Sequence, residues 1–316
     1  MQTIYLHIGR GKTGTTTIQS CLPTWQTELL NQGIHYLNAD GGKLGSGHQN
    51  FGKSFIKELP DYMLPPQSPE QVQATVAAEI EQSKAPIIII SSENLEMADV
   101  GSIFRFFEDL PRTYLVKIIF FVRSQDELAE SEYNQMVKLK REHKPFEQFI
   151  EQDLEGYDFM TAASRWETFF GTENIICRIY DGSTQSIITQ FLSCIDTGKT
   201  ESPVNIGQLV QPVSKSSANT SIGIKALTLA KLLNELDIDD RETHYARLFN
   251  QLSANDLPAL LMDAEQARQF RQKFASSNHE FTQRFMSSAC QDLGGRRYSD
   301  QQRNLIRQQI KALQLL

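Results

Sequence analysis

The sequence is poor in cysteine, and its four cysteines lie too far apart to form a familiar cluster. They stand at positions 21, 177, 194 and 290, with no C-x-x-C pair among them. This spacing argues against a disulfide framework and against a structural metal site. Because Cys21 and Cys177 lie within apolar patterns, we expect buried free thiols in a reduced, cytoplasmic protein that holds no metal.

Long apolar runs and an excess of positive charge are also missing. No run approaches the roughly 18 residues that a membrane span needs, and no basic and apolar leader precedes the β-prone stretch that begins at Ile4. The formal net charge of −7 argues against a general nucleic-acid or membrane-surface binder. With 316 residues, 40% of them hydrophobic, the chain is expected to be soluble and globular. A polyanionic ligand would therefore need a local basic pocket.

The most informative stretch begins at residue 3 and reads TIYLHIGRGKTGTTTIQSCL. Residues 4–8 predict a short strand, residues 9–14 a glycine-rich turn, and Thr15 the start of a helix. Glycines permit tight backbone angles and close approach to a ligand. The first N–H groups of a helix lack partners within it, and the helix dipole adds positive potential there. The stretch predicts an anion-binding turn; a threonine-capped turn without a ligand is the alternative.

The position of the lysine decides which anion this turn would suit. In the nucleotide-triphosphate loop, G-x-x-x-x-G-K-[ST], the lysine directly follows the second glycine. Here Gly9 and Gly14 have the matching separation, but Thr15 stands where the lysine would be. Lys12 lies two residues before Gly14 instead, which gives the sequence KTGTT. A nucleoside triphosphatase is therefore not the first choice.

Apolar, β-branched runs alternate with helical patterns along the first two thirds of the chain. This order predicts an α/β fold: a parallel central sheet with helices on both faces, like that of P-loop NTPases. Strands are expected at 4–8, 87–90, 115–122 and 174–180, with a short extended piece at 34–37. Helices are expected at 15–31, 48–59, 69–84, 101–110, 125–142, 146–151, 157–170 and 183–194. Ligands of such sheets bind at the carboxyl ends of the strands, where residues 9–12, Glu93 and Arg123 fall.

The character of the chain changes after residue 196. A polar stretch, 197–220, precedes helical patterns at 221–236, 241–252, 263–291 and 299–315. We therefore expect a cofactor-binding α/β core over residues 1–196 and a helical C-terminal region over 197–316. Packing of this region on the core is favoured over an independent domain.

A second motif follows the strand expected at 115–122. Arg123 directly follows that strand, and Ser131 lies eight residues later on the next predicted helix. Arginine offers phosphate a rigid bidentate fork, and serine can donate one further hydrogen bond. Taken singly, each residue also fits a structural role, as a sheet-edge arginine and a helix-surface serine.

Together, KTGTT and R-x7-S resemble the cytosolic-type sulfotransferase superfamily, in a divergent bacterial form, over about residues 3–190. The resemblance implies transfer of a sulfuryl group from 3′-phosphoadenosine 5′-phosphosulfate (PAPS) to an acceptor hydroxyl or amine, on a carbohydrate or small metabolite, without a metal. It also implies where PAPS and its product, adenosine 3′,5′-bisphosphate (PAP), would bind. The implied residues are Arg10, Gly11, Lys12, Thr13, Gly14, Thr15, Thr16 and Thr17 for the 5′ end, and Arg123 and Ser131 for the 3′-phosphate.

The resemblance is incomplete at the C-terminal end. The R-K-G-x-x-G segment that closes over the donor in this superfamily is absent, and residues 215–221 are the candidate replacement. The acceptor pocket is expected to involve residues 38–66 and the helical C-terminal region, because such pockets are built from variable loops. No feature of the sequence indicates an oligomeric state.

The implied chemistry needs a stabilising cation and a base. Lys12 and the helix N-terminus can stabilise charge on the leaving oxygen. The acceptor must lose a proton, for which Glu93 at a strand end and His48 after a glycine-rich loop are the candidates. Glu93 could instead cap the following helix, and His48 could be a helix-terminal or surface histidine.

Two other functions stay open at this point. A P-loop kinase or other NTPase is one, although the displaced lysine and the lack of a clear magnesium-binding aspartate count against it. A catalytically inactive binding scaffold of the same fold is the other. Mg²⁺-dependent turnover of ATP would support the first, and failure to bind PAP would support the second.

Overall fold

The computed structural model describes residues 1–38, 47–61, 63–66, 68–182, 184–196, 221–236, 251–252, 256–286, 293 and 297–313. The chain divides into two compact units. Unit 1 consists of Met1–Val122, Phe159–Ser216 and Glu280–Ala289. Unit 2 consists of Arg123–Asp158, Ser217–His279 and Cys290–Leu316.

Unit 1 is built on a five-stranded sheet in the order β2-β3-β1-β4-β5, with every pair parallel. The strands are β1 (Gln2–His7), β2 (Ile34–Tyr36), β3 (Ile87–Ser91), β4 (Tyr114–Val122) and β5 (Ile175–Ile179). All five residues of β3 are buried, as expected for a β-branched run in the middle of a sheet with both faces covered.

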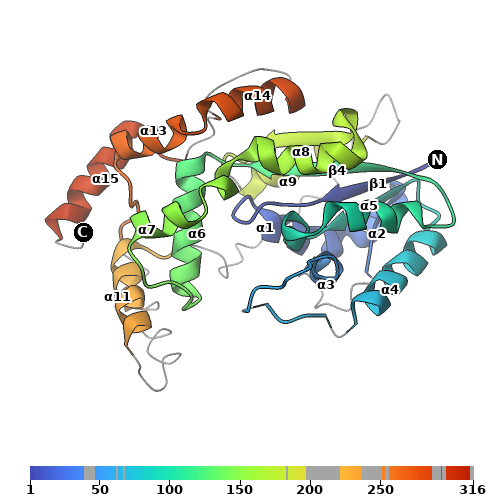
Figure 1. The fold of residues 1–316 in the computed structure, drawn as a ribbon, viewed down its shortest axis with the longest axis horizontal. Helices are drawn as coiled ribbons and strands as arrows, with labels where there is room; N and C mark the ends of the chain where they lie inside the picture. The colour runs from blue at the N-terminus through green and yellow to red at the C-terminus, as the bar shows by residue number, and fades with distance from the viewer. Residues whose placement is uncertain are drawn as a thin grey trace. The chain divides into compact units, whose positions relative to one another are not determined.

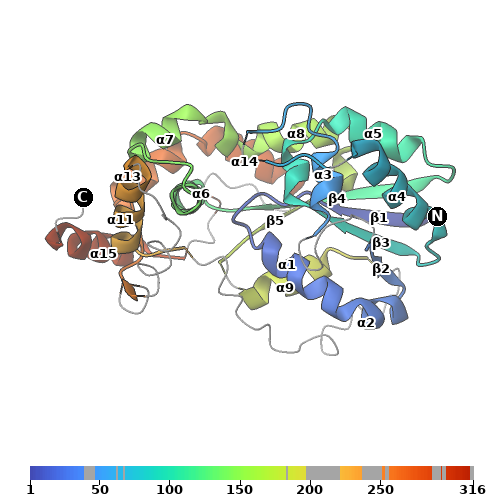
Figure 2. The ribbon, with the colours of Figure 1, turned by 90° about the horizontal axis from the view of Figure 1, so that it is seen from below.

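Helices cover both faces of this sheet (Figures 1 and 2). Figure 2 shows α1 (Thr15–Cys21), α2 (Gln26–Asn31) and α9 (Thr184–Ser193) on one face. The other face carries α3 (Gln49–Lys53), α4 (Pro69–Gln82), α5 (Val100–Glu108) and α8 (Phe159–Phe170). The prediction of a parallel α/β sheet with helices on both faces is confirmed.

Several details of the fold differ from the predicted elements; the helix expected at 48–59, for example, spans only Gln49–Lys53. The extended piece expected at 34–37 is a paired edge strand, since Ile34 and Tyr36 lie opposite Ile87 and Ile89 of β3. The helix expected at 15–31 is interrupted by a 3₁₀ turn, η1 (Leu22–Trp25), with Pro23 near its start. Proline lacks the N–H that an α-helix interior requires.

One hydrophobic core cluster of unit 1 lies against the face that α1, α2 and α9 cover. Ile18, Leu22, Phe191 and Leu192 are fully buried there with residues of β1, β3 and β4. Cys21, Cys177 and Cys194 are buried free thiols; Cys290 lies outside the described residues.

Among the described residues, unit 2 consists mainly of helices, with one isolated antiparallel bridge between Gly223 and Pro258. Its elements are α6 (Gln125–Lys138), α7 (Phe146–Gln152), η3 (Glu155–Tyr157), α11 (Ile224–Glu235), α13 (Ala264–Gln272) and α15 (Asp300–Ala312). The boundary to unit 1 falls within α14 (Ala275–Phe285). The helix expected at 263–291 is therefore two helices, α13 and α14, because Lys273 and Phe274 form a tighter turn between them.

Unit 2 combines residues 123–158 with the C-terminal helices, and the division of the chain after residue 196 stays a prediction. α6 and α7 belong to unit 2, with the C-terminal helices. A buried ion network joins α6 to α13 and α15 within unit 2. Asp126 of α6 lies 2.9 Å from Arg271 of α13 and 3.1 Å from Arg303 of α15. Glu130 of α6 lies 2.7 Å from Arg303.

Candidate functional site

The glycine-rich turn follows β1 at the carboxyl edge of the sheet. β1 and β3 are neighbours, with His7 opposite Ser91, and the Ser92 N–H donates to the carbonyl of His7 over 3.0 Å. The turn after β1 and the segment after β3 therefore leave the sheet from adjacent points. The parallel register places the predicted loop and Glu93 at this edge.

The backbone of the turn is held in an unusual conformation. Gly14 has a φ of 85°, and a Cβ there would lie 2.9 Å from Cγ1 of Ile187. Lys12 has a φ of 66°, in the left-handed region of the backbone that residues other than glycine rarely adopt. The left-handed conformation costs roughly 1–2 kcal/mol for an L-residue. A lysine kept in this conformation at a strand-to-helix turn is a candidate functional residue.

Three side chains of the turn, those of Arg10, Thr13 and Thr15, make contacts that stabilise the turn itself. The hydroxyls of Thr13 and Thr15 both donate to the carbonyl of Arg10, over 2.5 Å and 3.4 Å. The Arg10 guanidinium is paired with Glu96 at 2.6 Å and lies 5.4 Å from the ring centroid of Phe159. These three side chains therefore stabilise the loop, although they fall among the residues that the resemblance assigned to the donor.

Other members of the turn are open to solvent in part. Gly11, Lys12, Thr16 and Thr17 are each partly exposed, and a Cβ built on Gly11 would meet nothing within 4 Å. No side chain caps the N-terminus of α1. A ligand can approach the backbone at Gly11, so the turn fits an anion.

Glu93 begins the 3₁₀ turn η2 (Glu93–Met97), two residues after β3 ends. Its side chain reaches solvent, but protein surrounds it closely enough that desolvation raises the pKa of the carboxyl. The charge of Lys12 opposes this shift, and the charge of Glu96 adds to it. Glu93 and Lys12 thus act on each other electrostatically at the edge of the sheet.

His48 occupies a buried position below this edge. Its Nδ1 accepts the N–H of Ser91 over 3.0 Å, so its Nε2 carries the proton and donates to the carbonyl of Leu37 over 2.8 Å. Burial lowers the pKa of the imidazole. Both ring nitrogens are engaged with the backbone, which favours a structural role over the role of base that the sequence left open.

A hydrogen-bonded cluster of polar side chains next to the turn, formed by His7, Ser91, Gln19 and Gln49, was not predicted from the sequence. Nδ1 of His7 lies 2.8 Å from Oγ of Ser91, which also accepts the side-chain amide of Gln19 over 3.3 Å. Gln19 in turn accepts from Gln49 over 3.2 Å. One feature of the sequence indicates this cluster: His7 and Ser91 are polar residues at the ends of otherwise apolar strands.

The second motif lies in a pocket of about 600 Å³ within unit 2. Arg123, just before α6, and Ser131 on α6 both line it, so the two predicted 3′-phosphate residues share one cavity. Its other lining residues are Glu127, Glu130, Asn134, Lys138, Ser221, Ile222, Gly223, Ala226, Asp256, Pro258, Ala259, Leu260, Arg297 and Tyr298.

Arg297 and Tyr298 were not predicted. The Arg297 guanidinium lies 5.3 Å from the ring centroid of Tyr298, which adds a second arginine and an aromatic ring to this pocket. The sequence LGGRRY at 293–298 is basic and glycine-rich. Nothing in it indicates that the backbone of Arg297 contacts Glu127, which lies 170 residues earlier in the sequence. Of the predicted replacement segment 215–221, only Ser221 lies among the described residues.

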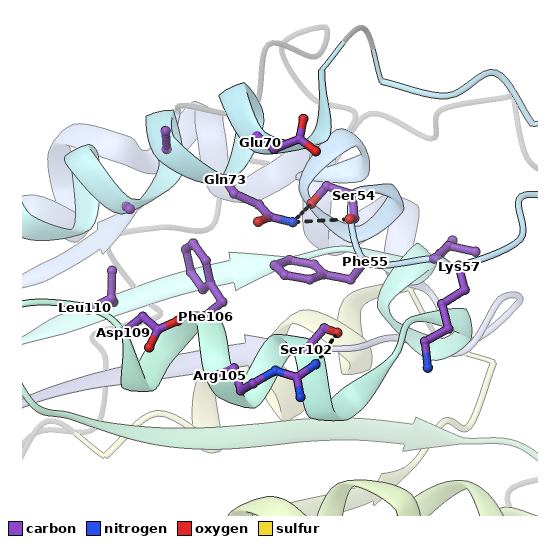
Figure 3. Close-up of a pocket in the computed structure, with 13 residues that line it drawn as sticks. Ser54, Phe55, Lys57, Glu70, Gln73, Ser102, Arg105, Phe106, Asp109 and Leu110 are labelled. Carbon is purple, nitrogen blue, oxygen red and sulfur yellow. Dashed lines mark hydrogen bonds between the residues drawn. The ribbon is translucent and has the colours of Figure 1, made fainter.

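A different pocket, of about 580 Å³, lies between α3, α4 and α5 of unit 1 (Figure 3). The rings of Phe55 and Phe106 line it, and Gln73 reaches across to Ser54 over 3.2 Å. Ser54–Lys57 fall in the range expected to contribute to an acceptor pocket. Neither Lys12 nor Glu93 is among the described residues that line it, so we do not assign it to the acceptor.

Neither a metal-ligand cluster nor a membrane-spanning helix is found within the described ranges. No group of three or more His, Cys, Asp or Glu residues there could hold a metal ion. No described helix is both long and apolar enough to cross a membrane.

Comparisons with known proteins give likenesses at the level of structure. No protein-family model and no curated protein sequence matches the chain. A sulfotransferase from Alicyclobacillus acidocaldarius is 15% identical, with a TM-score of 0.39 over 85% of this chain and 99% of its own. Mouse sulfotransferase SULT7A1, solved in complex with PAP, is 14% identical, with a TM-score of 0.36 over 87% of this chain and 89% of its own. With both TM-scores below 0.5, these likenesses add nothing to the argument from the residues.

Proposed function

We propose that the protein is a sulfotransferase that uses PAPS as its donor. The observation that carries the proposal is Lys12: it is held with a positive φ in a strand-to-helix turn and acts electrostatically on Glu93. The displaced lysine is the feature that separates KTGTT from the nucleotide-triphosphate loop. Arg123 and Ser131, in one cavity, support the assignment of a 3′-phosphate.

Two sets of residues would each bind a different part of the donor. The backbone at Gly11, the first turn of α1, and Thr16 and Thr17 would bind the 5′-phosphosulfate. Arg123 and Ser131 would bind the 3′-phosphate, with Arg297 as a second guanidinium. Thr13, Thr15 and Arg10 keep the turn in shape from within.

When bound, PAPS supplies an activated sulfuryl group for in-line transfer, a reaction governed by positioning and charge stabilisation. The Lys12 ammonium stabilises the negative charge that develops on the bridging oxygen of the nucleotide. The Glu93 carboxylate accepts the proton of the acceptor hydroxyl or amine. A raised pKa makes this carboxyl a better base at neutral pH than an ordinary glutamate. We assign the base to Glu93 rather than to His48, whose nitrogens are engaged with the backbone.

The acceptor is proposed to be a carbohydrate or small metabolite and the compartment the cytoplasm. We propose no metal in the reaction, because the lysine and arginine charges suit a group that carries less charge than a phosphoryl. Neither a nucleic acid nor a membrane is a proposed partner. A P-loop NTPase is the second candidate, and Mg²⁺-dependent ATP turnover by the purified protein would favour it.

The proposal is tested by release of PAP from PAPS in the presence of an acceptor panel of sugars, alcohols and amines. We expect Lys12→Ala to lower turnover at least about a hundredfold, the scale for removing one donor that stabilises a transition state. Lys57→Ala is the matched control, because Lys57 is an exposed lysine of unit 1 that pairs with Asp99. Turnover of Lys12→Ala within a few-fold of the control would contradict the assignment.

A further inference from the structure

Glu127 has a position in the Arg123 pocket that neither motif explains. It lies on α6, one turn after Arg123, and its side chain is only 3% exposed. One carboxylate oxygen, Oε2, accepts from the Nε of Arg123 over 3.3 Å and from its Nη2 over 3.0 Å. The other, Oε1, accepts the backbone N–H of Arg297 over 2.6 Å and that of Tyr298 over 3.3 Å.

The backbone contacts of Oε1 hold the carboxylate in place, and the carboxylate in turn holds Arg123. Two consecutive backbone N–H groups hold Oε1, so Glu127 cannot swing away from the pocket wall without leaving them unpaired. Oε2 then engages the Nε edge of Arg123. A guanidinium is planar, so anchoring this edge also sets the plane of the edge formed by its two terminal nitrogens.

Glu127 also connects two walls of the pocket that are far apart in the sequence. Arg123 stands at the N-terminal end of α6, whereas Arg297 and Tyr298 lie just before α15. One buried carboxylate contacts the guanidinium of Arg123 and the backbone of Arg297 and Tyr298, so it joins these two segments of the pocket wall. An exposed pair would have little value for this purpose, but the Arg123 side chain is only 13% exposed.

We propose that Glu127 is a positioning residue for binding of a phosphate monoester in this pocket, which it achieves by presenting Arg123 in one fixed orientation. The inference rests on the proposed function, because it takes the ligand to be the 3′-phosphate of the nucleotide. The opposing possibility is that the carboxylate competes with the phosphate for Arg123. The two ideas predict opposite effects of removing the charge.

The test compares affinities for PAP and for adenosine 5′-monophosphate, which lacks the 3′-phosphate, by isothermal titration calorimetry. The ratio of the two dissociation constants is the 3′-phosphate preference. Glu127→Asp keeps the charge but shortens the side chain, and Glu127→Gln keeps an acceptor for the two N–H groups but loses the ion pair. We expect either variant to lower the preference at least about tenfold, the scale of one charge-assisted hydrogen bond.

Glu265→Gln is the matched control, since Glu265 makes an exposed ion pair with Arg268 within the same unit; its preference should equal that of the wild type. Thermal melting of each variant shows whether it is folded, and the second variant serves if the first is not. A preference that stays the same or rises in either folded variant, while Arg123→Ala abolishes it, overturns the positioning role alone. A wild type that binds PAP no better than the monophosphate overturns the proposed function as well.

Discussion

Glu93 is the single residue on which the proposed chemistry depends most. Glu93→Gln keeps the shape of the side chain and removes only its ability to accept a proton. We expect turnover to fall at least about a hundredfold, within the range for loss of a general base, while the dissociation constant for PAP stays within a factor of about two. Stopped assays and calorimetry on one preparation measure both quantities. Normal turnover by Glu93→Gln, with an inactive His48→Ala, would reverse the two roles.

The same substitution should change how stability depends on pH. Because the folded pKa of Glu93 is raised above its ordinary value of 4.5, the folded protein binds more protons than the unfolded chain between the two values. The free energy of unfolding therefore falls as pH rises through that window. Glu93→Gln should remove this decrease, and urea unfolding between pH 4 and pH 8 would show it.

His7 should have the opposite effect on stability. Burial lowers the pKa of His7 from 6.5 to about 3, so between these values the unfolded chain binds a proton that the folded protein does not. The free energy of unfolding should fall on acidification below pH 6.5, by up to about 1.4 kcal/mol for each pH unit. His7→Gln should reduce proton uptake on unfolding by about one. Equal pH dependence in wild type and His7→Gln would contradict the shift.

At the scale of elements, α6 is the helix whose placement matters most. It carries Ser131 and begins two residues after Arg123, and its buried carboxylates Asp126 and Glu130 are held by arginines of α13 and α15. Burial raises the pKa of Glu130 even though Arg303 opposes the shift. The helix is therefore fixed by charge pairing rather than by an apolar face alone.

Arg303 is the arginine that contacts both carboxylates, and its side chain is 2% exposed. Arg303→Met leaves these buried carboxylates short of a cation, and we expect it to lower the free energy of unfolding by about 3–5 kcal/mol. Arg268→Met, which breaks an exposed pair, should cost no more than about 1 kcal/mol. Urea unfolding of both variants gives the comparison. A loss for Arg303→Met no larger than that of the control would show that the network contributes little.

Elements could be predicted wherever their signal is local. The Ile87–Ile90 run specifies a buried strand by itself, and the β–turn–α order specifies a parallel sheet. Positions set by contacts between distant residues were not readable. His48 meets Ser91 and Leu37, and Glu127 meets Arg297, only after the chain has folded. The break between α13 and α14 was missed because no proline or glycine marks it.

At the scale of the whole molecule, a chain of net charge −7 is proposed to bind a polyanion. Local cations must outweigh the general repulsion, and Lys12, Arg123 and Arg297 are proposed to supply them. The candidate residues form two motifs in the sequence, and their roles stay predictions. Glu93 was visible at a strand end, whereas the contact of Glu127 with Arg123 and with the backbone of Arg297 was not.

The central claim is that one nucleotide uses both motifs, each for a different phosphate. The most direct measurement is calorimetric titration of wild type, Lys12→Ala and Arg123→Ala with adenosine 3′,5′-bisphosphate, adenosine 5′-monophosphate and adenosine 3′-monophosphate. Lys12→Ala should weaken the two ligands that carry a 5′-phosphate and spare the 3′-monophosphate. Arg123→Ala should weaken the two ligands that carry a 3′-phosphate and spare the 5′-monophosphate. Each loss of affinity should be at least about tenfold. Equal losses for all three nucleotides, or a wild type that binds none of them, would contradict the account.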